Sequence, residues 1–205
     1  MKKAFLLFLV ILIGFGCSDT NEPESKSKKG FIPSESKPND LVPMAIGNYW
    51  EYLNPDNEKV VIKVLWNLDN TKLKDTANNE LDYNLNLWEM IISGKHFSQG
   101  FDLWGFENKK LIMAHSITKM ITKDFTANKN AIFDSDNFDF IDVSDVETNL
   151  GIAKNCLKYS NRNHISNEED EINYFFKEGI GIVKIIYSNP NYKHYNLTIS
   201  DYYVK

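Results

Sequence analysis

The amino-acid sequence predicts an all-β protein: an antiparallel meander rolled into a sandwich, a half-barrel or a barrel, preceded by a disordered tether. Three observations favour this fold class. From Leu41 onward, short runs of aromatic and β-branched residues alternate with polar residues. Asn, Asp, Gly and Pro separate these runs, as expected for turns. No segment has the spacing of a convincing amphipathic helix.

The first two strands are the clearest. Tyr49–Leu53 is followed by the turn-forming segment Asn54–Asn57 and then by Glu58–Trp66, which alternates with a period of two. A period of two places alternate side chains on opposite faces of a strand. One face of the second strand is therefore expected to carry Val60, Ile62, Val64 and Trp66.

The same reasoning extends the meander to the end of the chain. Turns are expected at Gly94–His96, Glu107–Lys109 and Ser188–Asn191. Two segments do not fit: Asp69–Leu81 is charged and suits a short helix or a loop, and Phe125–Asn149 is the least regular part. The further strands are expected at Tyr83–Ser93, Phe101–Glu107, Lys110–Ser116, Gly151–Asn161, Glu171–Phe176, Gly181–Tyr187 and Tyr192–Tyr203.

The N-terminus reads as a bacterial lipoprotein signal over residues 1–16. Lys2 and Lys3 precede an apolar stretch, Ala4–Gly16, and polar residues begin directly after Cys17. The stretch is shorter than the roughly 20 apolar residues that a membrane span needs. Gly14 and Phe15 stand where a Leu-like and a small residue are usual. An ordinary secretory signal with an incidental cysteine, or an uncleaved anchor helix, therefore stays open.

If Cys17 is lipidated, its acyl chains, such as palmitate, would hold the protein on a bilayer. Residues 17–40 are rich in Ser, Lys, Glu and Pro and are expected to form a flexible linker spanning about 25 Å. Residues 41–205 would form a single β domain. Ser18 is not the aspartate that retains lipoproteins in the inner membrane of enteric bacteria, which favours the outer membrane, with a periplasmic or surface face left open.

Composition excludes some partners. The formal charge is −5, and removal of residues 1–16 would take away Lys2 and Lys3 and leave −7. An acidic chain has no electrostatic reason to bind nucleic acid. Arg162 is the only arginine, which disfavours bidentate clamps for phosphate. With Cys17 lipidated, Cys156 would have no disulfide partner and is expected to be a small buried hydrophobic residue.

Three patches resemble a group of Bacteroidetes-type secreted lipoproteins of unknown function. Leu41–Tyr52 resembles their "PLxxGNxWxY" opening, Gly151–Lys158 their "GTFxNCLK" strand, and Tyr174–Lys184 their "YYAPGVGLVK" strand pair. Ile152 and Ala153 replace Thr and Phe of that pattern, and residues 71–149 match none of it. The resemblance implies an all-β, exported lipoprotein without assigned activity, and it carries over no catalytic residue.

Candidate chemistry is sparse. The four histidines lack the spacing of metal ligands, and no nucleophile elbow or phosphate-binding loop occurs, so we expect neither enzyme activity nor a cofactor. Asp134, Asp136 and Asp139 are weak calcium candidates, because Asn137 and Phe138 break the calcium-loop pattern. A solvated acidic loop is the favoured interpretation of that run.

Five aromatic residues are candidates for contact with a ligand: Trp50, Tyr52, Trp66, Trp88 and Trp104. For Trp50 and Tyr52 we favour packing across the sheet, as is usual for aromatic residues in strands. Gly179 and Gly181 suit a bulge or turn where φ is positive or where a neighbouring chain passes closely.

Three functions compete. The first is a lipid-anchored envelope lipoprotein with a non-enzymatic domain that binds a hydrophobic, glycan or protein ligand. The second is an envelope assembly component that docks through an edge strand. The third, a hydrolase, would need carboxylates from Asp134–Asp142 and a histidine to converge in one cleft.

Overall fold

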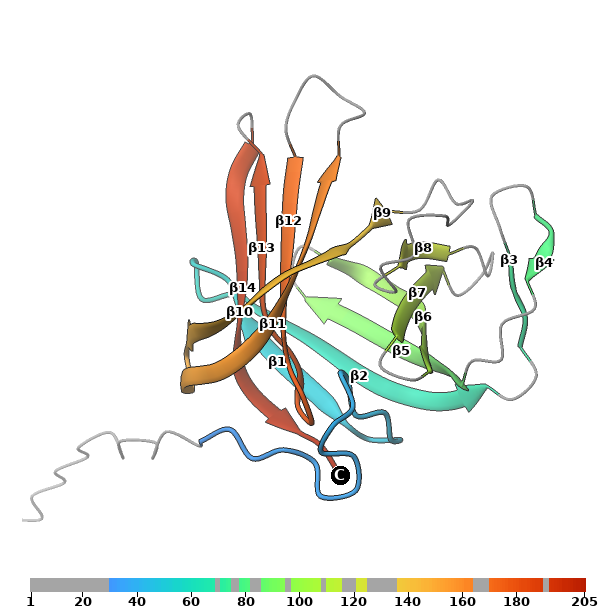
Figure 1. Ribbon diagram of the computed structural model, residues 1–205, viewed down its shortest axis with the longest axis horizontal. Coiled ribbons are helices and arrows are strands. Elements are labelled where there is room, and N and C mark those ends of the chain that lie inside the picture. Colours follow the sequence, from blue (N-terminus) through green and yellow to red (C-terminus); the bar gives the residue numbers. More distant parts are fainter. Residues whose placement is uncertain are drawn as a thin grey trace, which may run out of the picture.

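A computed structural model (Figure 1) describes residues 30–68, 71–74, 78–81, 86–94, 97–107, 110–115, 121–124, 136–163, 170–189 and 192–205. Strands dominate these residues, which contain no helix, and the predicted all-β class is confirmed. The strands are β1 (Tyr49–Leu53), β2 (Lys59–Leu68), β3 (Leu73–Lys74), β4 (Glu80–Leu81), β5 (Asn86–Gly94), β6 (Phe97–Glu107), β7 (Lys110–His115), β8 (Ile121–Asp124), β9 (Asp136–Asn137), β10 (Asp139–Thr148), β11 (Gly151–Asn163), β12 (Asp170–Lys177), β13 (Gly181–Asn189) and β14 (Tyr192–Tyr203).

The main sheet has 12 strands in the order β10-β11-β12-β13-β14-β1-β2-β5-β6-β7-β8-β9. Neighbouring strands are antiparallel except β8 and β9, which are parallel. The sheet curls into a half-barrel, one of the three forms expected from the sequence (Figure 1). Strands β3 and β4 form a separate two-stranded sheet.

The two ends of the main sheet are joined by one residue. β9 and β10 occupy opposite ends of the strand order, yet only Phe138 separates them in the sequence. In Figure 1 this ribbon crosses from β8 to β11. Phe138 is fully buried and meets Tyr174 of β12 edge to face, with ring centroids 5.1 Å apart. The sheet must therefore curl enough for its two ends to meet.

Alternate side chains of β1 and β2 are buried in the core as predicted, with one exception. Trp50, Tyr52, Val60, Ile62 and Val64 are buried, but Trp66 is 58% exposed. The register against β5 shifts between Val64 and Trp66, so a bulge at this point reverses the alternation. The expectation that Trp66 shares the face of Val64 is wrong for this reason.

Three segments with no expected strand contain strands. Ile121–Asp124, which follows the expected strand Lys110–Ser116, forms β8. Asp69–Leu81 holds β3 and β4, in place of the expected helix or loop, and Leu73 of β3 is buried. Phe125–Asn149 holds β9 and the ten-residue strand β10. The register of β10 against β11 shifts twice, around Ile141 and around Asp145. These bulges interrupt the period of two that identifies a strand in a sequence.

Residues 30–40, which we name the N-terminal strap, pack against the domain although composition placed them in the linker. Ser34 N–H donates to the carbonyl of Gly179 (2.7 Å), and Gly179 N–H donates to that of Asp40 (2.8 Å). Ile32 N–H donates to the hydroxyl of Tyr202 (2.6 Å). In Figure 1 the strap passes close to the C-terminal end of β14. The packed domain thus extends to Gly30, and residues 1–29, including Cys17, lie outside the described part.

A helix long and apolar enough to cross a membrane is absent from the residues that the structure describes.

Candidate functional site

The two aromatic candidates on β1 are structural. The indole N–H of Trp50 donates to the carbonyl of Ile180, and the hydroxyl of Tyr52 donates to that of Ile182 at 2.9 Å. Both side chains are almost completely buried. Burial raises the pKa of Tyr52 well above its ordinary value. Neither side chain is available to an external ligand.

The three remaining tryptophans lie in different environments. Trp88 and Trp104 are cross-strand partners on β5 and β6, whereas Trp66 lies exposed on β2. Trp88 is half-buried, with the Lys37 ammonium of the strap 5.5 Å from its ring centroid. Trp104 is buried, and its indole N–H finds no hydrogen-bond partner among the described residues. The structure therefore brings two of the five aromatic candidates together at one register position and exposes only Trp66.

The calcium candidates do not form a described site. Asp134 lies outside the described residues, Asp136 belongs to β9, and Asp139 is exposed at the start of β10 opposite Ser160. Within the described ranges no group of three or more metal-ligating side chains occurs. For the hydrolase hypothesis, the imidazoles of His96, His115, His164 and His194 also fall outside what the structure describes.

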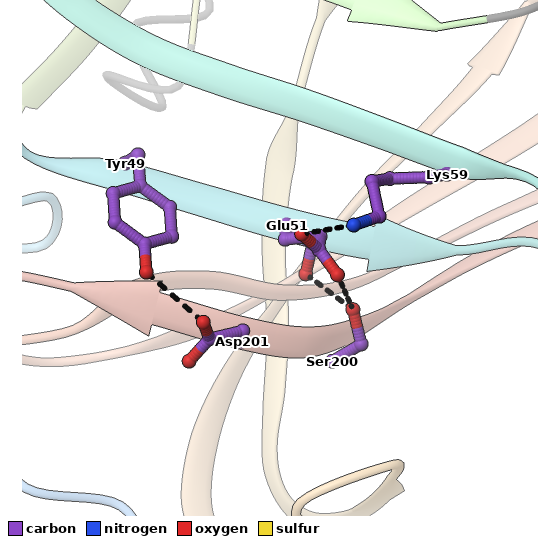
Figure 2. A network of polar contacts seen from close by, with 5 residues as sticks. All are labelled: Tyr49, Glu51, Lys59, Ser200 and Asp201. Atoms are coloured by element: carbon purple, nitrogen blue, oxygen red, sulfur yellow. Dashed lines mark hydrogen bonds and ion pairs between the residues drawn. The ribbon is translucent and has the colours of Figure 1, made fainter.

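A polar network joins the three central strands on the outer face of the sheet (Figure 2). Tyr49 donates to Asp201 (2.9 Å), and Lys59 pairs with Glu51 (2.8 Å). Ser200, the extra residue of a bulge in β14, donates to both the backbone and the side chain of Glu51 (3.2 Å each). Burial, followed by the bond to Asp201, raises the pKa of Tyr49. Each charged group has a partner, so the network serves to fix β1 between β2 and β14.

A groove of about 270 Å³ lies where the strap meets the end of β14. It is lined by Ile32, Pro33, Glu35, Tyr202, Tyr203, Val204 and Lys205. Drug-sized ligands usually occupy clefts of about 300–1,000 Å³ with convergent polar groups. This groove is smaller than that range, and its Tyr202 hydroxyl already bonds the strap.

The most unusual surface is the first half of β10. Its residues Asp139–Val143 are all exposed, so both faces of the strand meet solvent there. Phe140, Ile141 and Val143 are 48%, 50% and 53% exposed. In the described part of the chain only β11 pairs with β10, and no described strand is hydrogen-bonded to the outer edge of β10. We name Asp139–Val143 the exposed edge segment.

The exposed edge segment has one apolar and one acidic face. Phe140 and Val143 pair with Tyr159 and Leu157 of β11, which are two residues apart and share a face. Asp139 and Asp142 pair with Ser160 and Lys158, which share the other face. The bulge around Ile141 makes this possible, because without it Phe140 and Val143 would point to opposite faces.

The apolar face of this segment is the outer end of an aromatic row. Phe140 meets Tyr159 edge to face (5.7 Å between centroids), Tyr159 meets Phe176 (5.6 Å), and Phe176 stacks with Tyr174 (6.1 Å). Tyr174 in turn contacts the buried Phe138. The apolar interior thus continues without interruption onto an exposed strand, a feature that the sequence did not reveal because Phe125–Asn149 read as irregular.

Few known proteins are similar to this chain. No family model and no curated protein matches the chain. Two solved structures are similar at 10% identity, each over 80% of this chain and 99% of theirs. One is a Parabacteroides distasonis protein provisionally assigned as a lipoprotein (TM-score 0.45), and the other a Bacteroides fragilis protein provisionally assigned as exported, with a YmcC-like fold (TM-score 0.48). Likeness at this level supports no argument about function.

Proposed function

We propose that this chain is a lipid-anchored lipoprotein of the bacterial cell envelope whose β domain is a non-enzymatic binding domain for a protein ligand. The anchoring half of the proposal rests on the sequence: Lys2 and Lys3, the apolar Ala4–Gly16, and Cys17 before polar residues. Twelve residues, 18–29, lie between Cys17 and the first described residue, Gly30. The outer membrane is the proposed location.

The binding half rests on one observation, the exposure of Asp139–Val143 on both faces of an edge strand. Natural proteins usually shorten, cover, bulge or charge such edges, because an unpaired strand invites pairing with other chains. β10 has bulges and carboxylates, but its length is ten residues and no described strand covers its outer edge. Here three large apolar side chains are half-exposed on the strand. A domain that retains such a surface is suited to contact another protein.

A protein ligand suits the described interior better than a small hydrophobic ligand or a glycan. The main hydrophobic core includes four almost completely buried aromatic residues, Trp50, Tyr52, Phe138 and Phe176. Two of the five aromatic candidates for ligand contact, Trp50 and Tyr52, are held by hydrogen bonds to β13 and to the turn before it. An accessible apolar surface remains on β10, where only a partner that covers a strand could bury it.

Metabolic labelling tests the anchor. A bacterial host expressing the full chain with an alkyne fatty acid should label it, and the Cys17→Ser variant should remain unlabelled and leave the membrane fraction. Density separation of the two membranes then locates the labelled chain. Labelling that persists in the Cys17→Ser variant, or none in the natural chain, would contradict the anchoring proposal.

A further inference from the structure

We infer that the exposed edge segment, Asp139–Val143, accepts a partner strand with apolar side chains on one face and basic side chains on the other. The inference rests on the proposed binding function and specifies the partner. Adding a strand to a sheet edge supplies main-chain hydrogen bonds, and alternate side chains supply specificity. Two observations define the side chains of the partner strand, and a third argues against a second copy of this chain as the partner.

The first observation is the apolar face. Phe140 and Val143 extend the aromatic row that begins at Phe138, but no strand lies beyond them in the described part of the chain. A strand paired with the outer edge of β10 would place alternate side chains beside these two residues. Apolar side chains there would bury the exposed half of Phe140 and Val143 and complete the row.

The second observation is the acidic face. Asp139 and Asp142 lie on it, and Asp145 and Glu147 continue the run of exposed carboxylates along β10. β10 contains no Lys or Arg. Lys158 of β11 neighbours Asp142 on the inner side, with its ammonium 5.9 Å from the Phe175 ring centroid. On the outer edge of β10, away from β11, the strand supplies no cation of its own to the carboxylates. Basic side chains of a partner strand would therefore complement these carboxylates.

The third observation argues against a second copy of this chain as the occupant. Pairing β10 with its own copy would bring two strands with four carboxylates each to one interface. Like charges opposite one another destabilise paired strands, and opposite charges stabilise them. The two bulges add to this selectivity, because an irregular edge rejects partners whose side chains do not follow its register.

Two matched peptides test the inference. The protein is the chain from residue 17 with Cys17→Ser, which remains in solution. One eight-residue peptide alternates Lys and Val, and the other alternates Glu and Val. Fluorescence anisotropy measures binding, and hydrogen–deuterium exchange locates it. We expect the Lys/Val peptide to bind about tenfold or more tightly than the Glu/Val peptide, to weaken with salt, and to protect residues 139–148.

Variants separate the two faces. Asp139→Lys with Asp142→Lys should reverse the preference between the peptides. Phe140→Ser with Val143→Ser should weaken the Lys/Val peptide about tenfold, whereas Ile152→Ser, which removes an exposed apolar side chain at the other end of the hairpin, should not. A Lys/Val peptide that is N-methylated at every backbone amide keeps its charge but has no N–H group to donate to β10 from either edge, and it should not bind.

Several results would overturn the inference. The inference fails if the Lys/Val peptide shows no saturable binding, or if the Glu/Val peptide or the N-methylated peptide binds as tightly as the Lys/Val peptide. It also fails if the protected amides lie outside β10. Self-association with protection of β10 in the absence of peptide would assign the edge to a second copy. Because the assay uses the Cys17→Ser chain and no lipid, failure of both peptides to bind would overturn this inference and leave the anchoring proposal, which the labelling experiment tests, intact.

Discussion

Gly151 and Gly181 have nearly the same backbone angle in different surroundings. Their φ values are +113° and +111°, a region that residues with a Cβ rarely adopt. A Cβ at Gly151 would meet nothing within 4 Å, whereas one at Gly181 would lie 2.9 Å from the indole nitrogen of Trp50. The positive φ expected at Gly181 from the sequence is confirmed. Which residue lies close to Gly181 depends on the packing of β1 against β13, which are far apart in the sequence.

Alanine at the two positions should therefore separate strain from crowding. Gly151→Ala should lower the free energy of unfolding by about 1–2 kcal/mol through backbone strain alone. Gly181→Ala should lower it by about 2–5 kcal/mol, because the Trp50 ring must also move. Urea denaturation followed by circular dichroism measures both. Equal losses would show that the Trp50 contact yields without cost.

Cys156 is buried, and its thiol donates to the carbonyl of Ala153. Burial raises the pKa of the thiol from 9.0 to about 11. The folded chain therefore keeps a proton that the unfolded chain releases above pH 9. The stability that this thiol contributes is present below pH 9 and is lost as the pH rises towards 11. Burial also raises the pKa of the Tyr52 and Tyr202 hydroxyls.

We expect the denaturation midpoint to fall between pH 9 and 11, and to fall less steeply in Cys156→Ala. At pH 8 the native thiol should react with a disulfide reagent at least about a hundredfold more slowly than the unfolded thiol, since its thiolate fraction is smaller by the two-unit pKa difference. The measurement uses a Cys17→Ser background. Rapid reaction in the native state would mean that the β10–β11 hairpin opens readily.

Among the elements, the N-terminal strap is held by several contacts. The hydroxyls of Ser34 and Ser36 donate to the carbonyl of Lys205. The Tyr202 hydroxyl accepts from Ile32 N–H and lies 3.3 Å from the carbonyl of Gly30, and its ring stacks on Phe31. On the other side, Gly179 exchanges two backbone hydrogen bonds with Ser34 and Asp40. A Cβ at Gly179 would lie 2.7 Å from Pro33 and from the carbonyl oxygen of Pro38, which accounts for glycine at this turn.

Tyr202→Phe should loosen the strap while leaving the sheet intact. The loss of the hydroxyl leaves Ile32 N–H without its partner, at a cost of about 1–2 kcal/mol. Hydrogen exchange and proteolysis should increase at residues 30–40 and not in β1 or β14. Tyr203→Phe, at an exposed neighbour that stacks on Tyr49, is the matched control and should change neither. Faster exchange throughout the domain would instead assign Tyr202 to global stability.

Some of these elements can be predicted from the sequence and others cannot. β1 and β2 were predicted closely because each pairs a period-two pattern with a turn, and only the bulge before Trp66 reversed a face. β10 was missed because its two bulges and its carboxylates hide the alternation. Composition predicts a linker for the strap because the partners of its backbone groups, Gly179 and Tyr202, lie far away in the sequence. Local composition does not record such contacts.

Curling of the sheet places its two ends one residue apart at Phe138. That side chain is fully buried between the halves, whereas Phe140, two residues later, is 48% exposed. Substituting the two phenylalanines in turn shows how much each end of the aromatic row contributes to the free energy of unfolding. One closes the interior of the domain and the other extends it to the surface.

Phe138→Ala should lower the free energy of unfolding by about 3–5 kcal/mol, the range for large buried aromatic residues. Phe140→Ala should cost less than about 1 kcal/mol, because solvent already reaches half of its side chain. Thermal and urea unfolding measure both variants. A similar cost at the two positions would indicate that the exposed edge segment packs more firmly than its exposure suggests.

The central position of β1 has a consequence for how the domain is made. Residues 49–53 lie between β2, which follows directly, and β14, whose paired residues are 198–203. About 150 residues must therefore be synthesised after β1 before its second edge is covered, and such long-range pairing is slow to form. A nascent chain of this topology cannot complete its sheet until β14 has emerged. For the exported lipoprotein proposed above, this late completion would leave the polypeptide extended during its synthesis.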